Sequence, residues 1–155
     1  VLYYWFMENT TKKSSNLQQP RQELRTVRHC VFNLHVHLVF VTKYRQKIFT
    51  KIYLNFMRKI FTEICVDYQA ELVEFEGEVD HVHLLINYPP QAQISKMINS
   101  LKGVSSRMLK KSHPEITKWY YNKQSLWSPS YFAASCGGAP IEIVRQYIEL
   151  QKTPH

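Results

Sequence analysis

The sequence predicts an α+β fold of the ferredoxin-like, split βαβ type: an antiparallel sheet, two helices on one of its faces, and a further helix at the C-terminus. Segments with a two-residue hydrophobic period and segments with a helical period follow one another as strand, helix, strand, strand, helix, strand and helix. The chain has 155 residues, which suits one domain, and 45% of them are hydrophobic, which is enough for a core.

The N-terminal part differs from the rest, because residues 7–28 are polar and almost without apolar periodicity. We therefore expect a flexible arm over residues 1–29 and one domain over residues 30–155. The first strand is expected over residues 30–42. Its even-numbered positions from 32 to 40 are apolar, whereas its odd-numbered positions include the polar residues Asn33, His35 and His37.

Three further strands are expected, over residues 71–76, 79–88 and 126–136. In the first of these, Val73 and Phe75 alternate toward one face and Leu72 stands apart from them. Pro129 lacks the backbone donor of an inner strand, so the last strand should lie at a sheet edge or carry a bulge. In the usual strand order of this fold, the first and third strands are central, adjacent and antiparallel.

The helices follow from apolar residues at helical spacing over residues 50–67 and 91–111. His113-Pro114 should end the second of them, and Pro140 should begin the C-terminal helix, where a proline is tolerated. The first two helices are expected to cover one face of the sheet, which leaves the other face available for function.

The net charge of +8 and the pI of about 9.4 favour an anionic partner, with nucleic acid as the leading candidate; a solvated basic surface explains them equally well. The three cysteines are odd in number and widely spaced, which argues against a disulfide framework or a structural zinc site and fits a reducing cytoplasm. No apolar run approaches the length of a membrane span, so no membrane partner is expected.

Two His-x-His pairs are candidates for a metal site. His81 and His83 should point to the open face of the sheet, and two imidazoles on one strand face can converge on a divalent cation such as Mg²⁺ or Mn²⁺. His35 and His37 should point to the same face of the neighbouring strand. The period does not rank the two pairs, and either one is also compatible with a surface or partner-facing role.

Tyr147 and Gln151 lie one turn apart on the C-terminal helix. A tyrosine on an amphipathic helix is usually a packing residue. A phenol can act as a nucleophile when a metal polarises the group it attacks, and an amide oxygen can bind the same metal. This combination makes chemical sense only if the helix packs on the histidine face.

Basic and aromatic residues combine in a pattern that is typical of single-stranded nucleic acid binding, although a solvated face over a core of aromatic residues explains any one of them equally well. The candidate DNA-binding residues are Lys43, Arg45, Lys102, Arg107, Lys110, Trp127 and Tyr131.

Taken in order, four stretches of the chain resemble the small single-tyrosine HUH transposases of the insertion sequence 200/605 family. They are residues 37–49, 73–90, 94–111 and 126–151. The resemblance implies that His81 and His83 are the metal ligands, that Gln151 is the third protein ligand, and that Tyr147 is the nucleophile. It also implies a transposase that cleaves and rejoins single-stranded DNA at hairpin-bearing ends, with Mg²⁺ or Mn²⁺, through a 5′-phosphotyrosine intermediate.

The same resemblance implies a homodimer whose tyrosine helices cross at a Gly137-Gly138 hinge, so that each site combines the histidines of one subunit with the tyrosine of the other. Two alternatives stay open at this point. One is a ferredoxin-like module that binds single strands without catalysis, and the other is a nicking enzyme of the replication-initiator type. The latter normally has a differently connected fold.

Overall fold

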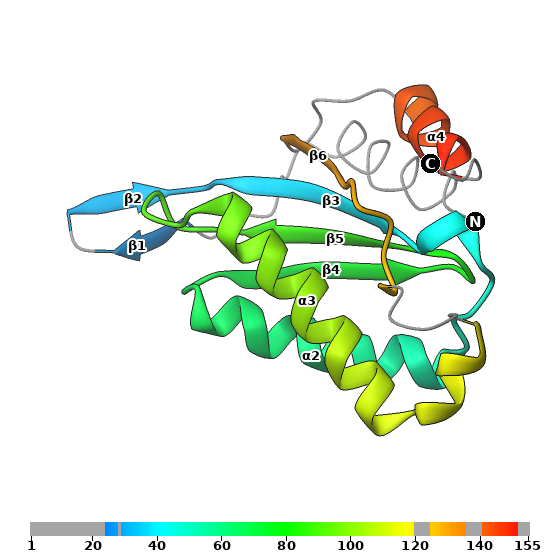
Figure 1. Ribbon diagram of the computed structural model, residues 1–155. Coiled ribbons are helices and arrows are strands. Elements are labelled where there is room, and N and C mark those ends of the chain that lie inside the picture. The colour runs from blue at the N-terminus through cyan, green and yellow to red at the C-terminus, as the bar shows by residue number, and fades with distance from the viewer. Residues whose placement is uncertain (1–23, 28, 120–124, 136–140, 152–155) are drawn as a thin grey trace.

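Figure 1 shows the computed structural model of the chain, which describes residues 24–27, 29–119, 125–135 and 141–151. A four-stranded antiparallel sheet has the strand order β4-β5-β3-β6. In chain order, the strands of this sheet and the helices between and after them are β3 (His35–Val41), α2 (Lys51–Asp67), β4 (Glu71–Gly77), β5 (His81–Asn87), α3 (Ile94–Ser112), β6 (Phe132–Ser135) and α4 (Ile141–Leu150). This order confirms the predicted split βαβ fold, with the first and third predicted strands adjacent at the centre.

The expected strand over residues 30–42 is divided in two. β2 (Cys30–Phe32) pairs with β1 (Arg25–Val27) in a separate hairpin that extends from one end of the sheet (Figure 1). The guanidinium of Arg25 donates to Asn87 Oδ1 at 2.6 Å and to the carbonyl oxygen of Gln69 at 2.7 Å. Residues 25–27, which the sequence assigned to the arm, are therefore a strand tied to the domain, whereas residues 1–23 lie outside the described residues.

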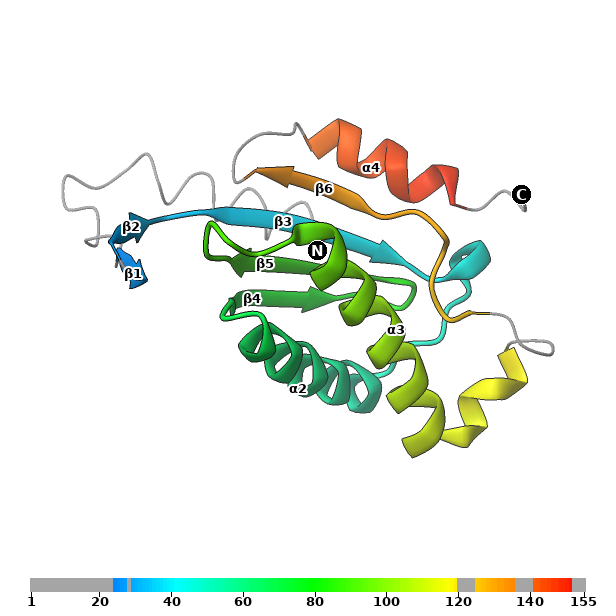
Figure 2. The ribbon, with the colours of Figure 1, turned by 60° about the vertical axis from the view of Figure 1, so that its left-hand side comes forward.

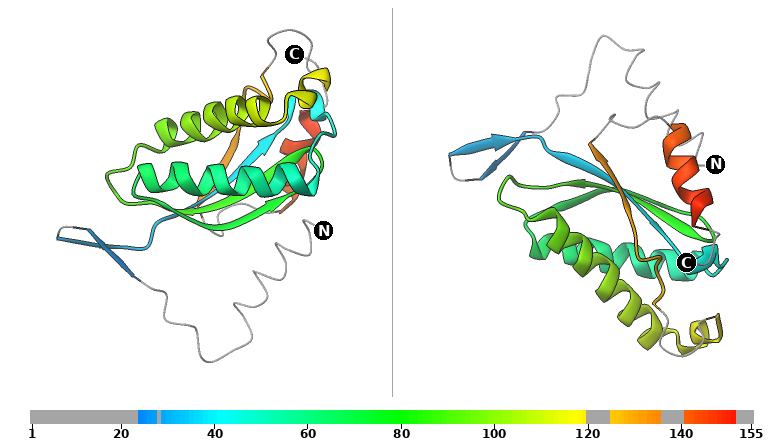
Figure 3. Two further views of the ribbon diagram at one scale, coloured as in Figure 1. Left: turned by 90° about the horizontal axis from the view of Figure 1, so that it is seen from below. Right: turned by 45° about the horizontal axis from the view of Figure 1, so that its top comes forward.

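Helices α2 and α3 cover one face of the sheet, and α4 lies on the other side (Figures 2 and 3). The covered face is the core, because alternate residues of β3 and β5 point into it. It joins buried side chains from four elements: Leu38, Phe40, Val82, Leu84, Ile86, Met57, Phe61, Met97 and Leu101. No helix among the described residues is both long and apolar enough to cross a membrane.

The prediction for Val73 was wrong, because β4 carries an irregularity between Leu72 and Glu74 where the pairing with β5 shifts by one residue. Leu72 packs against the core, and Val73 is 42% exposed. A β-bulge of this kind reverses the side-chain alternation, so Leu72 and Phe75 share a face although they are three residues apart.

The last strand is shorter than expected, and β6 lies at the sheet edge, as Pro129 indicated. In the preceding segment, Trp127 forms an isolated bridge with Thr42, and the amide of Ser128 donates to the carbonyl oxygen of Val41 at 2.7 Å. The ammonium of Lys102 on α3 donates to three consecutive carbonyl oxygens there, those of Ser128 at 2.8 Å, Pro129 at 3.3 Å and Ser130 at 3.1 Å. These contacts tie the segment to α3.

Lys102→Met should lower the free energy of unfolding by about 2 kcal/mol, because hydrogen bonds from a charged donor are each worth roughly 1.5–3 kcal/mol. Urea unfolding followed by circular dichroism measures this. Lys111→Met, on the exposed end of the same helix, is the matched control and should leave the midpoint unchanged. Equal midpoints for both variants would show that Lys102 does not anchor the segment.

Candidate active site

The open face of the sheet carries the candidate histidines. His83 pairs across the strands with Val39, and His81 pairs with Val41. Cross-strand partners point to the same face, and Val39 and Val41 belong to a small apolar cluster separate from the main core. His81 and His83 therefore lie on the face opposite α2 and α3, as predicted, and both are buried.

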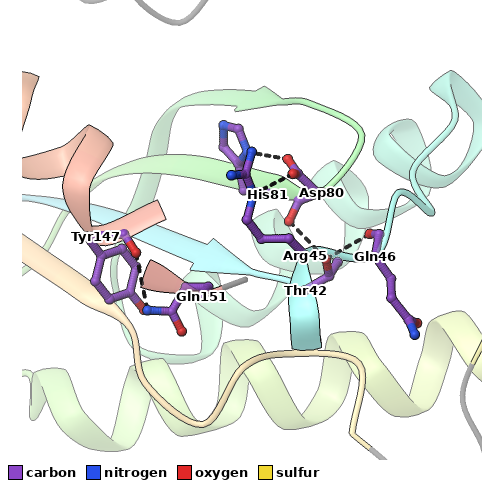
Figure 4. A network of polar contacts seen from close by, with 7 residues as sticks. All are labelled: Thr42, Arg45, Gln46, Asp80, His81, Tyr147 and Gln151. Atoms are coloured by element: carbon purple, nitrogen blue, oxygen red, sulfur yellow. Dashed lines mark hydrogen bonds and ion pairs between the residues drawn. The ribbon is translucent and has the colours of Figure 1, made fainter. Parts of the chain in front are cut away.

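The tautomer of His81 is set by Asp80. Nδ1 of His81 donates to Asp80 Oδ1 at 2.6 Å, and Asp80 Oδ2 accepts from Nε of Arg45 at 2.9 Å (Figure 4). Burial alone would raise the pKa of Asp80, but the hydrogen bonds from His81 and Arg45 and the guanidinium charge together lower it, so the carboxylate is ionised. Nε2 of His81 is buried, with no hydrogen-bond partner in the described part of the chain. A carboxylate on one imidazole nitrogen with the other left open is the usual arrangement of a metal-binding histidine.

Arg45 reaches Asp80 from a strained turn. Tyr44 and Arg45 in η1 (Lys43–Arg45) have φ angles of 59° and 53°, in the left-handed region that side chains with a Cβ rarely adopt. The hydroxyl of Thr42 lies 2.8 Å from the carbonyl oxygen of Gln46 and 3.1 Å from that of Asp80, which closes the turn (Figure 4). Two such residues in succession cost roughly 1–2 kcal/mol each, and the turn uses them to aim one guanidinium at one carboxylate.

His83 has a different neighbour on its Nδ1. That nitrogen lies 2.9 Å from Nε2 of His37 on β3, and the two rings stack with centroids 5.2 Å apart. Burial lowers the pKa of His37 to about 4 and that of His83 well below its usual value, so both rings are neutral at pH 7. His35 is the first residue of β3, two positions before His37, and its Nε2 lies 3.4 Å from the Asn87 amide nitrogen. The two histidine pairs thus lie on neighbouring strands, and His37 contacts His83 of the second pair.

Tyr147 comes to the same face on α4. Its ring and Ile148 pack on Val39, Val41 and Phe132. The hydroxyls of Tyr147 and Ser130 share a hydrogen bond of 2.9 Å. Burial raises the pKa of the Tyr147 phenol, and the hydrogen bond with Ser130 opposes this only in part. Helix α4 thus packs on the histidine face, as a shared site for Tyr147 and the histidines requires.

Gln151 lies beside Tyr147, and its amide donates to the Tyr147 carbonyl oxygen at 3.2 Å. Its Oε1 accepts from the hydroxyl of Ser128 at 2.5 Å. Sequence reasoning assigned no role to Ser128 or Ser130. They lie in the irregular segment before β6, where no side-chain period marks which residues turn inward.

The two parts of the site share a face, and among the described residues no hydrogen bond joins Tyr147 or Gln151 to His81. In Figure 4, Tyr147 and Gln151 form one group, and His81 with Asp80 and Arg45 forms another. Within the described ranges, no three His, Cys, Asp or Glu side chains gather as a metal site. A cation held by His81 and His83 therefore needs a further ligand of another kind, and the Gln151 amide oxygen is the candidate on that face. Such a set of imidazole and amide donors fits Mn²⁺ more closely than Mg²⁺, which prefers oxygen.

The candidate DNA-binding residues have diverse positions. Trp127 is 2% exposed, packs against Phe40 and Phe49, and donates from its indole nitrogen to the hydroxyl of Ser105. Trp127 therefore belongs to the core, and the prediction that it contacts DNA bases was wrong. Arg45 and Lys102 have the intramolecular partners described above. Tyr131 is 37% exposed. Contacts of DNA with Tyr131 and with the remaining candidates Lys43, Arg107 and Lys110 stay predictions, and Gly137 and Gly138 lie outside the described residues.

Comparisons with known proteins match most of the chain. The ISDra2 transposase TnpA of Deinococcus radiodurans is 29% identical over 129 residues, covering 83% of this chain and 91% of that protein. The transposase for insertion sequence element IS200 of Salmonella typhimurium is 28% identical over 127 residues, covering 82% of each chain. The crystal structure of a candidate transposase from Deinococcus radiodurans R1 superposes with a TM-score of 0.76 and 30% identity, covering 84% of this chain and all of that one.

The family model described as "Transposase IS200 like" matches residues 30–151, which include every element from β2 to α4. The matched residues include both histidines of β5 and Tyr147 of α4, which the fold brings to the same face of the sheet. The chain therefore belongs to the IS200-like transposase family.

Proposed function

We propose that this chain is a DNA transposase that cleaves and rejoins single-stranded DNA at hairpin-bearing element ends, through a 5′-phosphotyrosine intermediate on Tyr147. The observation that carries the proposal is that α4 places Tyr147 on the same face of the sheet as His81 and His83. The tyrosine and the Gln151 amide form one group on this face and the two imidazoles form another, so one substrate phosphate on that face could be reached from both.

His81 and His83 would hold a divalent cation, Mn²⁺ or Mg²⁺, with Gln151 as a further ligand. When bound, the cation supplies Lewis-acid polarisation of the scissile phosphate. The buried, unpartnered Nε2 of His81 supports this assignment, because a buried polar atom without a partner is unfavourable unless the site receives a ligand. Arg45 neutralises Asp80, so the carboxylate orients His81 without adding net negative charge at the point where a phosphate arrives.

In the covalent step, Tyr147 Oη attacks the phosphorus, the Oη–P bond forms, and the P–O3′ bond breaks. The phenol proton leaves through the nearest acceptor, the hydroxyl of Ser130, toward solvent, and the departing O3′ takes up a proton to become a 3′-hydroxyl. In rejoining, a 3′-hydroxyl attacks the phosphotyrosine and Tyr147 is released. The raised pKa of Tyr147 means that the phenol is poorly activated while it is bound to Ser130 alone.

The protein is further proposed to work as a homodimer in the cytoplasm, with the tyrosine helix exchanged between subunits. The small apolar contact of α4 supports this, because in the described part of that helix Ile148 and the half-buried Tyr147 are what pack on the cluster of Val39 and Val41. A contact of this size can be released and re-formed on a second copy at little free-energy difference.

Tyr147→Phe should abolish the covalent adduct between the protein and a single-stranded element end, because no oxygen remains to attack the phosphate. Binding of the hairpin should stay within about twofold of wild type, since the ring and its packing are kept. A denaturing gel after incubation with Mn²⁺ detects the adduct, and an electrophoretic mobility shift measures binding.

The matched control for this variant is Tyr53→Phe, a tyrosine on α2 at the other side of the sheet, which should form the adduct normally. Chelation of the cation should remove the adduct from wild type. An adduct that persists in Tyr147→Phe would reject the assignment, and binding without any adduct in wild type would favour the non-catalytic module.

Mixing two inactive chains tests the exchange of helices. His81→Ala keeps the tyrosine, and Tyr147→Phe keeps the histidines, so only a site shared between subunits regains both. Random pairing should restore about a quarter of the wild-type adduct yield per chain, because half of the dimers are mixed and half of their sites are complete. If the mixture stays inactive while the two chains demonstrably form mixed dimers, the helix acts within its own chain.

A further inference from the structure

Among the described residues, His37 contacts a proposed metal ligand and yet has no role in the proposed chemistry. It is 7% exposed, and it lies diagonally across the strands from His83, since His37 pairs with Leu85 and His83 pairs with Val39. The ring of Phe132 on β6 meets it edge-on, with centroids 6.5 Å apart. His37 therefore contacts a residue of β6 on one side and a residue of β5 on the other, and its Nε2 lies 2.9 Å from Nδ1 of His83.

This contact restricts the protonation of both rings. A neutral imidazole has one N–H and one lone pair, so two facing nitrogens form a hydrogen bond only when one donates and the other accepts. If His83 donates from Nδ1 to Nε2 of His37, then Nε2 of His83 carries a lone pair and can bind a cation. If His37 donates instead, the proton of His83 sits on Nε2 and blocks that atom.

We propose that His37 is a positioning residue that accepts a hydrogen bond from Nδ1 of His83 and thereby holds His83 in its metal-binding tautomer and orientation. The inference rests on the proposed function, because it takes His83 as a ligand. His37 does for His83 what Asp80 does for His81, through a neutral ring in place of a carboxylate. The facing nitrogens are consumed by their own hydrogen bond, so His37 is not itself a ligand through Nε2.

Asp80 behind His81 and His37 behind His83 differ in charge, which affects the charge of the site around a bound cation. Asp80 is neutralised by Arg45, and a His37 ring that accepts through the lone pair of Nε2 is itself neutral, so it adds no charge to His83. Neither orienting group therefore reduces the net positive charge available to a phosphate, whereas a second free carboxylate would. The site gains orientation of both imidazoles without losing attraction for an anionic substrate.

The first measurement is Mn²⁺ binding to the full chain without DNA, by isothermal titration calorimetry. His37→Phe keeps the ring packing and removes the acceptor, and it should weaken binding by about 10–100-fold, as loss of a partner behind a metal ligand typically does. His37→Gln places an amide oxygen near the former Nε2 and should restore most of the affinity. His35→Phe, on the same strand and face but in contact with Asn87, should bind as wild type does.

Two results would overturn the proposal in this experiment. One is a His37→Phe chain that binds Mn²⁺ as tightly as wild type. The other is a loss in His37→Gln as complete as in His83→Ala, which would make His37 a ligand itself. Circular dichroism of each variant shows whether the chain is folded. If His37→Phe does not fold, Mn²⁺ binding by His37→Gln still tests the proposal.

A second measurement is independent of cation binding. Nitrogen-15 NMR of the histidine rings in the chain loaded with Mg²⁺, and in the chain without metal, should show the proton of His83 on Nδ1 and a coupling through the hydrogen bond to Nε2 of His37. A proton on Nε2 of His83, or no coupling, overturns the proposal. If His83→Ala leaves Mn²⁺ binding unchanged, the metal site of the proposed function fails, and this coupling still decides whether His37 orients His83.

Discussion

The antiparallel pairing of β3 with β5 is the constraint on which the rest of the structure depends. Its register places Val36 opposite Ile86, Leu38 opposite Leu84 and Phe40 opposite Val82, so these side chains form the floor of the core under α2 and α3. The residues between them, including His81 and His83, necessarily point the other way. A slip of one residue would send the histidines into the core and the aliphatic side chains to the open face, which the free energy of burial forbids. Core packing and the site are therefore set by one register.

Burial on the open face explains the remaining arrangement of the site. A buried imidazole gains orientation from a partner on one nitrogen, and the chain supplies a different partner to each histidine of β5: the Asp80 carboxylate to Nδ1 of His81 and the His37 ring to Nδ1 of His83. The strained turn at Tyr44 and Arg45 belongs to the same arrangement, because it delivers the guanidinium that keeps Asp80 ionised. Tyr147 and Gln151 are held separately by Ser130 and Ser128, so bringing phenol and imidazoles onto one phosphate requires those serine contacts to be exchanged for contacts with the substrate.

Much of this was predictable from the sequence, and the misses have physical causes. Two-residue alternation predicted the strands and the face of His81 and His83, because burial of one face imposes that period, and the usual arrangement of the split βαβ fold predicted the strand order. It failed at Val73, where a bulge reverses the alternation, and at residues 126–131, where the chain is irregular and is tied to α3 by Lys102. Composition suggested that Arg45, Lys102 and Trp127 bind DNA, but long-range pairing with Asp80, with Ser128 and with Ser105 gives them partners that no local pattern reveals. The contact between His37 and His83 likewise depends on the register between β3 and β5, which the two-residue period does not determine.

The most direct test of the account is anomalous diffraction at the manganese edge from crystals of the chain equilibrated with Mn²⁺. The account predicts one peak per chain on the open face of the sheet, within about 2.0–2.3 Å of Nε2 of both His81 and His83, as expected for nitrogen ligands of a first-row divalent metal. It also predicts that Nδ1 of His81 stays on Asp80 and that Nδ1 of His83 stays on His37. A peak bound by His35 and His37 instead, or no peak at His81 and His83 under saturating Mn²⁺, would contradict it.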